Sequence, residues 1–587
     1  MKTFKKLFYF LSLREKKRAV LLLIMISLMA FIDMLGVASI MPYMAVLTNP
    51  GLIETNVFLS TMFQASIVIG VKTNQEFIFL LGVLVFVFLI FSLSFKAITL
   101  YVQMRFVQMR EYSIGKRLIE TYLHQPYSWF LNRNSADLGK TILSETGNIV
   151  NQGLAPLFNL FAQTLVTTAL IILLLFIDLK LTLIITLVIG GAYVLIFNLS
   201  RRYLDRIGKE RLIANELRFK SISEAFGASK EVKVSGLEQI FINRFSKPAV
   251  TFAKHQASSS IVSILPRFFI EAVAFGGMLL LILYIISKLG TLTNAIPIIA
   301  VYAFAGYRLI PSIQQIYYSS AILKFSSASI NKLYNDLKNL NAPNLNHDQS
   351  IIPFNKAITL NQINYNYPNT LRAALNDISL TIPVRTTVGL VGATGCGKTT
   401  TVDIILGLLV TQKGTLEVDG KIITKKNTRA WQRSIGYVPQ NIYLSDDTIA
   451  ANIAFGIDPK NISHQLIERA AKIANLHEFV NNELPNQYQT IVGERGVRLS
   501  GGQKQRIGIA RALYHNPKVL ILDEATSALD NETEEAFMSE VTKLSKNITI
   551  IIIAHRLTTV KNCNIIFKLD KGKLISEGTY DELITGI

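Results

Sequence analysis

Long apolar runs fill the chain up to about residue 320, whereas short apolar runs between polar stretches follow from about residue 354. Six of the long runs have the length of a membrane-spanning helix. They cover about residues 20–47, 77–102, 156–177, 179–199, 261–287 and 295–318. We therefore expect a helical membrane domain at residues 1–335, a polar linker at 336–353 and a soluble domain at 354–587.

The connections between these runs differ in length and charge. Residues 105–154 and 201–260 form long basic gaps with helical polar flanks, whereas the gap at 48–76 has Lys72 as its only basic residue. The N-terminal segment MKTFKKLFYFLSLREKKR is also basic. Because Lys and Arg favour the cytoplasmic side, this asymmetry predicts a cytoplasmic N-terminus, long cytoplasmic helical extensions and an external 48–76 gap.

The external gap contains the segment ETNVFLSTMFQASIVIG. Phe58, Leu59, Met62 and Phe63 form an apolar stripe at helical spacing within it. Two interpretations stay open. The segment is either a short helix that packs on its own bundle or a helix that lies in the outer interface near lipid tails.

The net charge of +20 also allows two interpretations. A basic chain can bind nucleic acid, or it can carry the Lys and Arg residues that set membrane orientation. We favour the second, because the basic N-terminal segment directly precedes an apolar run, and we expect no nucleic-acid partner. The two cysteines, Cys396 and Cys563, lie in the soluble half, where we expect no disulfide.

The soluble half alternates short apolar runs with helical stretches, as α/β folds with a parallel sheet do. Within it, VGLVGATGCGKTT combines a buried strand, a glycine turn and a helix start. Gly392, Gly395 and Gly397 let the backbone N–H groups wrap phosphate oxygens. Lys398 adds a charge for the outer phosphates, and the Thr399 hydroxyl suits Mg²⁺. The pattern indicates a nucleotide-binding P-loop.

The segment KVLILDEATSALD follows downstream. Its apolar run at 519–522 suits a central parallel strand. Asp523 ends this run, in position to hold Mg²⁺ through water. Glu524 comes next, in position to act as general base on the attacking water.

Two further motifs accompany these. LSGGQKQR would place the Ser500 hydroxyl and the backbone N–H groups of Gly501 and Gly502 at a helix N-terminus, which is an anion site. ITIIIIAHR is a strand that ends in His555, whose imidazole is placed to contact the γ-phosphate or to orient the water.

Together these motifs resemble the ATP-binding cassette of ABC transporters, and VGERG at 492–496 resembles the motif that precedes the signature in exporters. The resemblance implies that Tyr367 of YNYP stacks on adenine and that Gln440 of YVPQN senses Mg²⁺ and contacts the membrane half. It also implies that 527–530 joins two active sites. Cys396 stands where a serine is commoner.

The resemblance thus assigns ATP and Mg²⁺ as cofactors, with roles for individual residues. The catalytic residues would be Glu524, His555 and Gln440, and the Mg²⁺ residues Thr399, Gln440 and Asp523. The residues that would contact ATP are Tyr367, Gly392, Ala393, Thr394, Gly395, Cys396, Gly397, Lys398, Thr399, Thr400, Ser500, Gly501, Gly502 and Gln503.

In the family, two cassettes pair head to tail, and each LSGGQ closes over the nucleotide of its partner. With one cassette and six spans, the chain resembles an exporter half-transporter. This implies a homodimer with two composite ATP sites. The segments 126–139 and 224–236 resemble the coupling segments that dock on cassettes.

Five charged residues fall within the predicted spans. Lys96, Arg267 and Arg308 are basic, and Asp33 and Glu271 are acidic. The cations either pair with these carboxylates or line a cavity for an anionic head group. We favour the cavity, because three bases against two acids leave a surplus that a dimer doubles.

A second resemblance runs through most of the chain. FIDMLGVASIMPY, FKAIT, PRFFIEA and YRLIPS are similar to segments of bacterial lipid-linked oligosaccharide flippases, which serve protein glycosylation. The resemblance implies ATP-driven flipping of an undecaprenyl-pyrophosphate-linked saccharide across the bacterial inner membrane. The diphosphate would meet Lys96, Arg267 and Arg308, and the polyprenyl tail would stay in the membrane lipid.

Three alternatives differ from this hypothesis. An exporter of another lipid, a peptide or a drug would share every cassette residue. A non-transporting ABC ATPase of translation or DNA repair is excluded by six membrane spans. A membrane sensor that reads ATP state without moving cargo would differ from a flippase in reconstituted transport.

Overall fold

The computed structural model of the chain describes residues 2–68, 70–289, 296–340, 351–368, 370, 372–525, 531–554 and 557–585. It divides into two compact units. The first comprises Met1–Gln125 and Asn132–Pro343, and the second comprises Pro126–Leu131 and Asn344–Ile587.

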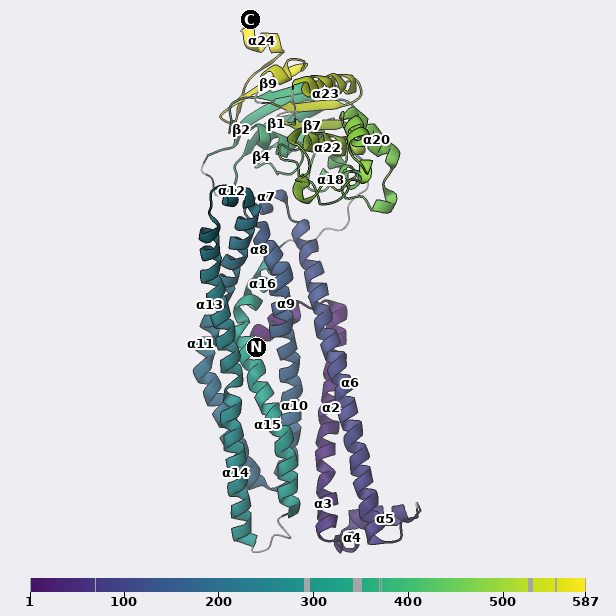
Figure 1. Cartoon of the computed structure of the whole chain (residues 1–587), viewed down its shortest axis with the longest axis vertical. Helices are drawn as coiled ribbons and strands as arrows, with labels where there is room; N and C mark the ends of the chain where they lie inside the picture. The colour runs from purple at the N-terminus through teal and green to yellow at the C-terminus, as the bar shows by residue number, and fades with distance from the viewer. Residues whose placement is uncertain are drawn as a thin grey trace. The chain divides into compact units, whose positions relative to one another are not determined.

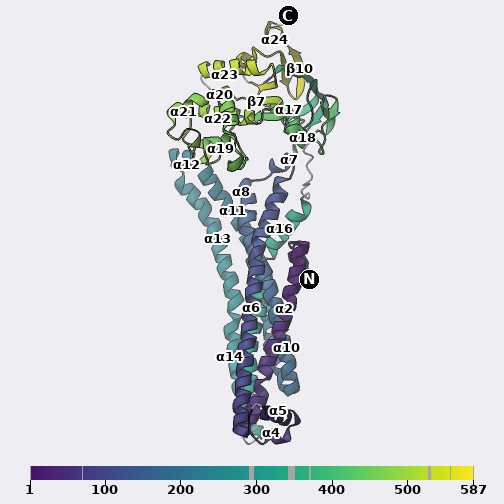
Figure 2. The same cartoon turned by 90° about the vertical axis from the view of Figure 1, so that its right-hand side faces the viewer.

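The first unit consists of helices, and the long ones run nearly parallel to one another (Figures 1 and 2). Its helices are α1 (Lys2–Tyr9), α2 (Leu13–Ala38), α3 (Ile40–Thr48), α4 (Leu52–Thr55), α5 (Val57–Ile67), α6 (Asn74–Leu123), α8 (Ser135–Lys140), α9 (Thr146–Ile149), α10 (Ala155–Ile177), α11 (Leu179–Gly227), α12 (Ser229–Val234), α13 (Glu238–Ile264), α14 (Pro266–Leu289), α15 (Ile296–Phe325) and α16 (Ser327–Asn339). Two π-helical turns, Thr141–Glu145 and Val150–Leu154, join α8, α9 and α10 into one continuous helical stretch.

Five helical stretches in the described part of the chain are long and apolar enough to cross a membrane. They are Leu13–Thr48, Asn74–Leu123, Ser135–Ile177, Thr182–Gly227 and Glu238–Gly277, and each overlaps one of the first five predicted spans. The sixth predicted span lies on α15 from Ile296 onward. The expected helical membrane domain is therefore confirmed.

Two of the predicted spans are not single helices. The first is divided at Ser39 between α2 and α3, and α3 has Pro42, which lacks an N–H group, in its first turn. The fifth is divided at Leu265, and Pro266 begins α14. In both places proline removes a backbone donor where a continuous helix would use one.

Two helices are much longer than a bilayer is thick. α6 has 50 residues and α11 has 49. At 1.5 Å per residue each is about 75 Å long, against a hydrocarbon core of about 30 Å. The predicted helical extensions therefore continue the second and fourth spans without a break.

Helices α4 and α5 lie at the end of the bundle where α3 ends and α6 begins (Figure 1). Leu59, Met62 and Phe63 of α5 pack in a cluster with Val46, Phe77 and other apolar residues of the bundle. The side chain of Phe58 points away from this cluster and is 67% exposed. Three of the four stripe residues thus pack on the bundle, whereas Phe58 is exposed.

The second unit contains two sheets. An antiparallel sheet has the order β2-β1-β4-β5, with β1 (Ala357–Tyr365), β2 (Leu375–Pro383), β4 (Lys413–Val418) and β5 (Lys421–Ile422). A second sheet has the order β10-β9-β3-β8-β7-β6, with β3 (Thr387–Val391), β6 (Ile435–Val438), β7 (Val519–Asp523), β8 (Thr549–Ile553), β9 (Ile565–Asp570) and β10 (Lys573–Gly578). Strands β9, β3, β8, β7 and β6 run parallel, as expected.

The helices of the second unit are mostly short. They are α7 (Tyr127–Phe130), α17 (Lys398–Ile405), α18 (Thr428–Gln432), α19 (Ile449–Ile453), α20 (His464–Ile473), α21 (His477–Glu483), α22 (Gly501–Tyr514), α23 (Asn531–Leu544) and α24 (Tyr580–Thr585).

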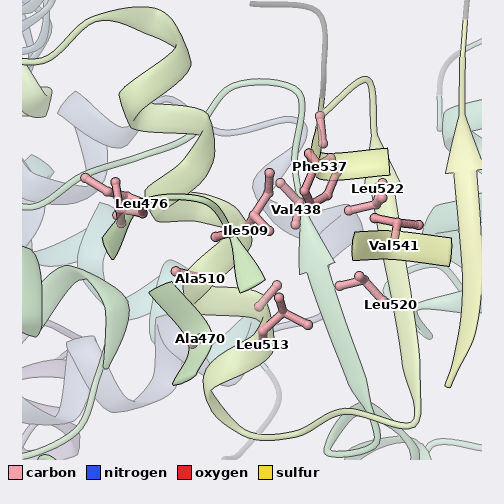
Figure 3. Close-up of a cluster of buried hydrophobic side chains, with 14 of the residues drawn as sticks. Val438, Ala470, Leu476, Ile509, Ala510, Leu513, Leu520, Leu522, Phe537 and Val541 are labelled. Atoms are coloured by element: carbon pink, nitrogen blue, oxygen red, sulfur yellow. The ribbon is translucent and has the colours of Figure 1, made fainter. Parts of the chain in front are cut away.

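The parallel sheet is buried on both faces, which explains why its strands are continuous apolar runs. Leu520 and Leu522 of β7 lie in one core cluster with Ile509 of α22 and Phe537 of α23 (Figure 3). Because neighbouring side chains of a strand point to opposite faces, Val519 and Ile521 lie in the other core cluster. That second cluster also contains apolar residues of α17 and of the antiparallel sheet.

Candidate nucleotide-binding site and membrane charge cluster

The glycine-rich turn lies between β3 and α17, at the carboxyl end of a buried strand. Its three glycines have positive φ angles, 148° at Gly392, 78° at Gly395 and 109° at Gly397. A Cβ at Gly392 would lie 2.2 Å from the carbonyl oxygen of Leu569. The sequence therefore needs glycine here both for the backbone conformation and for the close approach of β9.

Lys398 begins α17 and is buried at 5% exposure. Its ammonium donates to the carbonyl oxygens of Gly392 and Ala393 over 2.8 and 3.2 Å. The lysine thus folds over the turn, whereas Ala393, Thr394 and Thr399 are exposed along it. An open turn with exposed backbone N–H groups and a neighbouring lysine fits the phosphates of a nucleotide. The exposed Thr399 hydroxyl is accessible to Mg²⁺.

The carboxyl ends of the parallel strands meet at one edge of the sheet, because β8 lies between β3 and β7 and β6 follows β7. Asp523 is the last residue of β7 and is 5% exposed. The Tyr437 hydroxyl of β6 donates to its Oδ2 over 3.4 Å. Burial, and secondarily the charge of Asp523, raises the pKa of the Asp403 carboxyl in α17 from 3.8 to about 6. Two carboxyl groups, those of Asp523 and Asp403, thus lie close enough at this edge to repel each other, and a divalent cation would relieve that repulsion.

Gln440 and Glu524 contact each other directly. The side-chain amide of Gln440 donates to Oε2 of Glu524 over 2.7 Å. Glu524 has a φ angle of 51°, in the left-handed region that non-glycine residues seldom adopt. The structure thus places the two predicted catalytic residues together, 84 positions apart in sequence.

Tyr367 follows β1 and packs edge-to-face on Tyr365, with ring centroids 5.2 Å apart. Its hydroxyl and the Thr400 hydroxyl share a hydrogen bond of 3.1 Å. Burial raises the pKa of Tyr367. The predicted adenine-stacking residue is therefore hydrogen-bonded to α17, the helix that follows the phosphate turn.

The LSGGQ motif forms the start of α22. Ser500 is the N-cap, where its hydroxyl accepts from the backbone N–H of Gln503 over 3.2 Å and the Gln503 side chain accepts from the Ser500 N–H over 2.8 Å. Ser500 and Gly501 are exposed, and Gly502 and Gln503 are half-buried. The capping box orders this helix end and leaves its surface open to a ligand or partner.

Two predicted features lie outside the described residues. They are His555 and the segment 527–530.

Three charged residues of the membrane helices meet in one cluster. An Arg308 guanidinium nitrogen of α15 lies 2.7 Å from Oδ1 of Asp33 on α2, and the Lys96 ammonium of α6 lies 3.7 Å from Oδ2. Ser92 of α6 donates to Oδ1 over 3.5 Å. The Asp33 side chain is 2% exposed, against 16% for Arg308 and 36% for Lys96. We call Asp33, Lys96 and Arg308 the charge cluster.

The third predicted cation, Arg267, is paired separately. It donates to Glu271 over 2.7 Å within α14, and Gln314 of α15 donates to the same carboxylate oxygen over 3.1 Å. The Arg267 side chain is 56% exposed. Each of the three cations thus has an acidic partner, as the pairing interpretation expected, and the cluster keeps a surplus of one positive charge.

Sequence reasoning missed four of these polar residues. Ser92, Gln314, Tyr437 and Asp403 each contact or influence a residue that the sequence singled out. Asp403 has a signal that could have found it, since an aspartate inside the apolar run TVDIIL is unusual. The sequence around Ser92, Gln314 and Tyr437 has no such signal, and only the fold brings these residues close to their partners.

Two family models match the chain. The model described as "ABC transporter transmembrane region" matches residues 40–304, and the model described as "ABC transporter" matches residues 375–527. A solved structure described as a bacterial Atm1-family ABC exporter with ATP bound superposes with a TM-score of 0.77, over 97% of this chain and 96% of the other. Its sequence identity is 23%, so this likeness concerns the fold.

Curated relatives match over different shares of their length. The ATP-dependent lipid A-core flippase of Bordetella avium (strain 197N) is 30% identical over 481 residues, 80% of this chain and 79% of that protein. The heterocyst differentiation ATP-binding protein HepA of Nostoc sp. is 30% identical over 478 residues, 80% of this chain and 76% of that protein. The mitochondrial ATP-binding cassette sub-family B member 10 of Mus musculus is 42% identical over 250 residues, 40% of this chain and 35% of that protein.

Proposed function

The chain belongs to the ABC transporter family, and on that premise we propose that it is an ATP-driven lipid flippase that works as a homodimer. The family makes it an ATP-hydrolysing translocase that combines an exporter membrane domain with a cassette. The cargo in this proposal is a lipid with an anionic head group. The surplus positive charge of the cluster inside the membrane helices carries this proposal.

The geometry of the cassette supports the assigned roles. The phosphates of ATP would lie in the turn from Gly392 to Thr400, and Tyr367 would stack on adenine. Mg²⁺ would be held by Thr399, Gln440 and Asp523 and would neutralise phosphate charge when bound. Glu524 would accept the proton of the attacking water, because its carboxylate lies beside Gln440 at the edge of the sheet. His555 keeps its predicted role at the γ-phosphate.

The homodimer follows from the signature. The exposed end of α22 offers Ser500 and Gly501 to a second chain, and head-to-tail pairing would complete each ATP site. ATP binding would close the cassettes, and hydrolysis would reset them.

The anionic cargo follows from the cost of charge in a bilayer. A charged side chain at the centre of a membrane helix costs roughly 2.5–3.5 kcal/mol on insertion scales. Asp33 offsets one of the two cations in the cluster, which leaves one without a counter-charge. An anionic head group would supply that charge, and Arg267 would contribute a further contact. The names of several relatives, which are lipid A-core flippases, agree with a lipid cargo.

Within this class we propose a polyprenyl-pyrophosphate-linked oligosaccharide as cargo, with a role in protein glycosylation. The similarity of the membrane motifs to lipid-linked oligosaccharide flippases supports it. The proposal places the chain in a bacterial inner membrane with its cassette in the cytoplasm. The alternative is an exporter of another lipid, a peptide or a drug.

Reconstitution of the full chain into proteoliposomes tests the proposal. ATP hydrolysis and flipping are measured with polyprenyl-pyrophosphate saccharides, lipid A, peptides and drugs. We expect stimulation and flipping with the anionic lipids, and the largest effect with the polyprenyl-pyrophosphate saccharide. Stimulation by peptides or drugs alone would contradict a lipid cargo, and stimulation without movement of any cargo would indicate a sensor.

The variant Arg308→Ala tests the cluster. It should lower flipping of the anionic lipid at least about tenfold, because loss of a buried charge contact costs about 2 kcal/mol or more. Lys116→Ala is the matched control, because it removes an exposed cation that pairs with Glu120 on α6 away from the cluster. Equal flipping by both variants would remove Arg308 from the cargo site.

A further inference from the structure

Asp33 places a charged carboxylate inside the helical bundle, where packing alone requires no charge. It is almost fully buried, and two cations from different helices share it. Its Oδ1 faces Arg308 and Ser92, whereas Oδ2 makes no hydrogen bond with any described residue. A buried carboxylate with an unsatisfied oxygen is costly, so its presence calls for a reason other than stability.

The two cations are more exposed than the Asp33 carboxylate that they share. Lys96 lies 3.7 Å from Oδ2, beyond hydrogen-bond distance, and its ammonium makes no hydrogen bond within the described part of the chain. Its side chain is 36% exposed, whereas that of Asp33 is 2% exposed. Lys96, and to a lesser extent Arg308 at 16% exposure, therefore offers an incoming anion a surface that Asp33 does not.

The charges of the cluster add up simply. Lys96 and Arg308 contribute two positive charges and Asp33 one negative charge, so each chain has a surplus of one. Arg267 and Glu271 cancel each other. A homodimer would thus hold a surplus of two, which equals the charge of a pyrophosphate diester. Without Asp33 the surplus would be four.

We infer that Asp33 sets the charge of the cargo site, so that a head group with two negative charges binds firmly enough to be selected and weakly enough to leave. This inference rests on the proposed function and names Asp33 as a positioning residue that acts through Lys96 and Arg308. An excess of positive charge would hold the head group after the helices rearrange, which slows release. Matching the charge keeps the turnover fast.

The test uses the full chain in proteoliposomes with an undecaprenyl-pyrophosphate disaccharide as one probe and a bis-phosphorylated lipid A as the other. An uncharged polyprenol is the comparison lipid. Asp33→Asn should lower the half-saturating concentration of both anionic probes about tenfold and lower the maximal flipping rate. The uncharged polyprenol should show neither change. The anionic probe that the wild-type chain flips faster identifies the source of the head group, because the change in affinity itself scales with the charge of the probe.

A double variant separates charge from structure. Asp33→Asn with Lys96→Gln restores a surplus of one charge per chain, so its half-saturating concentration should return toward the wild-type value. If Asp33 served only packing, the second substitution would add to the damage. Asp33→Glu keeps the charge and should stay close to wild type.

Glu15→Gln is the matched control. Glu15 of α2 forms an ion pair with Arg110 of α6, so this variant removes another carboxylate, 13% exposed, between the same two helices. It should leave the half-saturating concentration of the anionic probes unchanged. The inference would be overturned if the half-saturating concentration rose or stayed the same in folded Asp33→Asn. It would also be overturned if the double variant showed no recovery of that concentration. The proposed function itself would be overturned if the wild-type chain flipped neither of the two anionic probes.

Discussion

Gln440 holds the carboxylate of Glu524 through a 2.7 Å hydrogen bond from its side-chain amide. Gln440 follows β6 and Glu524 follows β7, and these two strands are parallel neighbours. The contact joins the residue expected to communicate with the membrane half to the residue expected to activate water. Any movement of the Gln440 loop would therefore change the position of the general base.

Glu524→Gln should bind ATP and hydrolyse it about 10²–10⁴-fold more slowly, because the amide cannot accept a proton from water. The new side chain can still accept the hydrogen bond from Gln440 through its carbonyl oxygen. Single-turnover hydrolysis and binding of a fluorescent ATP analogue would measure the two effects. Hydrolysis at the wild-type rate would remove Glu524 as the base.

Gly392→Ala should weaken ATP binding and destabilise the cassette. A residue with a side chain is strained at a φ of 148°, and its Cβ would lie 2.2 Å from the carbonyl oxygen of Leu569. Strain of this kind alone costs about 1–3 kcal/mol. Urea unfolding followed by tryptophan fluorescence and ATP-analogue binding would measure both losses.

Gly395→Ala is the matched control in the same turn. Its φ is 78°, but a Cβ there would meet no atom within 4 Å. We therefore expect a smaller loss of stability than for Gly392→Ala. Equal losses in the two variants would show that the close approach of Leu569 does not limit this turn.

The sequence predicted most of the cassette because its strands are short buried runs that end in chemically distinctive residues. The predicted strand at 519–522 corresponds to β7, which also includes Asp523 as its last residue. The membrane spans could be predicted for a different reason, because length and apolarity define them. Helix breaks at Ser39 and Leu265 were not predicted, because a proline in a first turn is compatible with a continuous apolar run.

Pairings between distant helices were the part that the sequence left open. Asp33 and Arg308 are 275 positions apart in number, and nothing in their neighbours indicates which carboxylate serves which cation. Arg267 and Glu271 are four residues apart on one helix, so their pairing follows from helical geometry. Contacts of the first kind depend on tertiary packing, which periodicity does not encode.

Asp403→Asn should stabilise the cassette at neutral pH in the absence of Mg²⁺. Burial raises the pKa of Asp403 from 3.8 to about 6, so the folded protein holds this proton more strongly than the unfolded protein does. Its contribution to the free energy of unfolding therefore falls as pH rises from about 4 to about 6 and stays low above that. The difference at pH 7 is less than about 3 kcal/mol.

Trp431 provides the signal for this measurement, because its indole N–H donates to the carbonyl oxygen of Ile405 on the helix that contains Asp403. Urea unfolding in EDTA at pH 4.5 and pH 7 would be compared in a Trp129→Phe background. A wild-type chain whose stability changes with pH no more than that of Asp403→Asn would contradict the prediction.

Alkylation of the cysteines should be slow in the folded chain, and the adduct on Cys396 should weaken ATP binding. Cys396 is 3% exposed and Cys563 is 7% exposed, and burial raises the pKa of the Cys563 thiol to about 12. The sulfur of Cys396 lies 3.9 Å from the ammonium of Lys398, so an added group would displace the lysine that covers the phosphate turn. Cys563→Ser leaves Cys396 as the single thiol, so mass spectrometry after iodoacetamide treatment can relate labelling to ATP affinity. Unchanged affinity in the fully labelled variant would mean that the turn accommodates the adduct without moving Lys398.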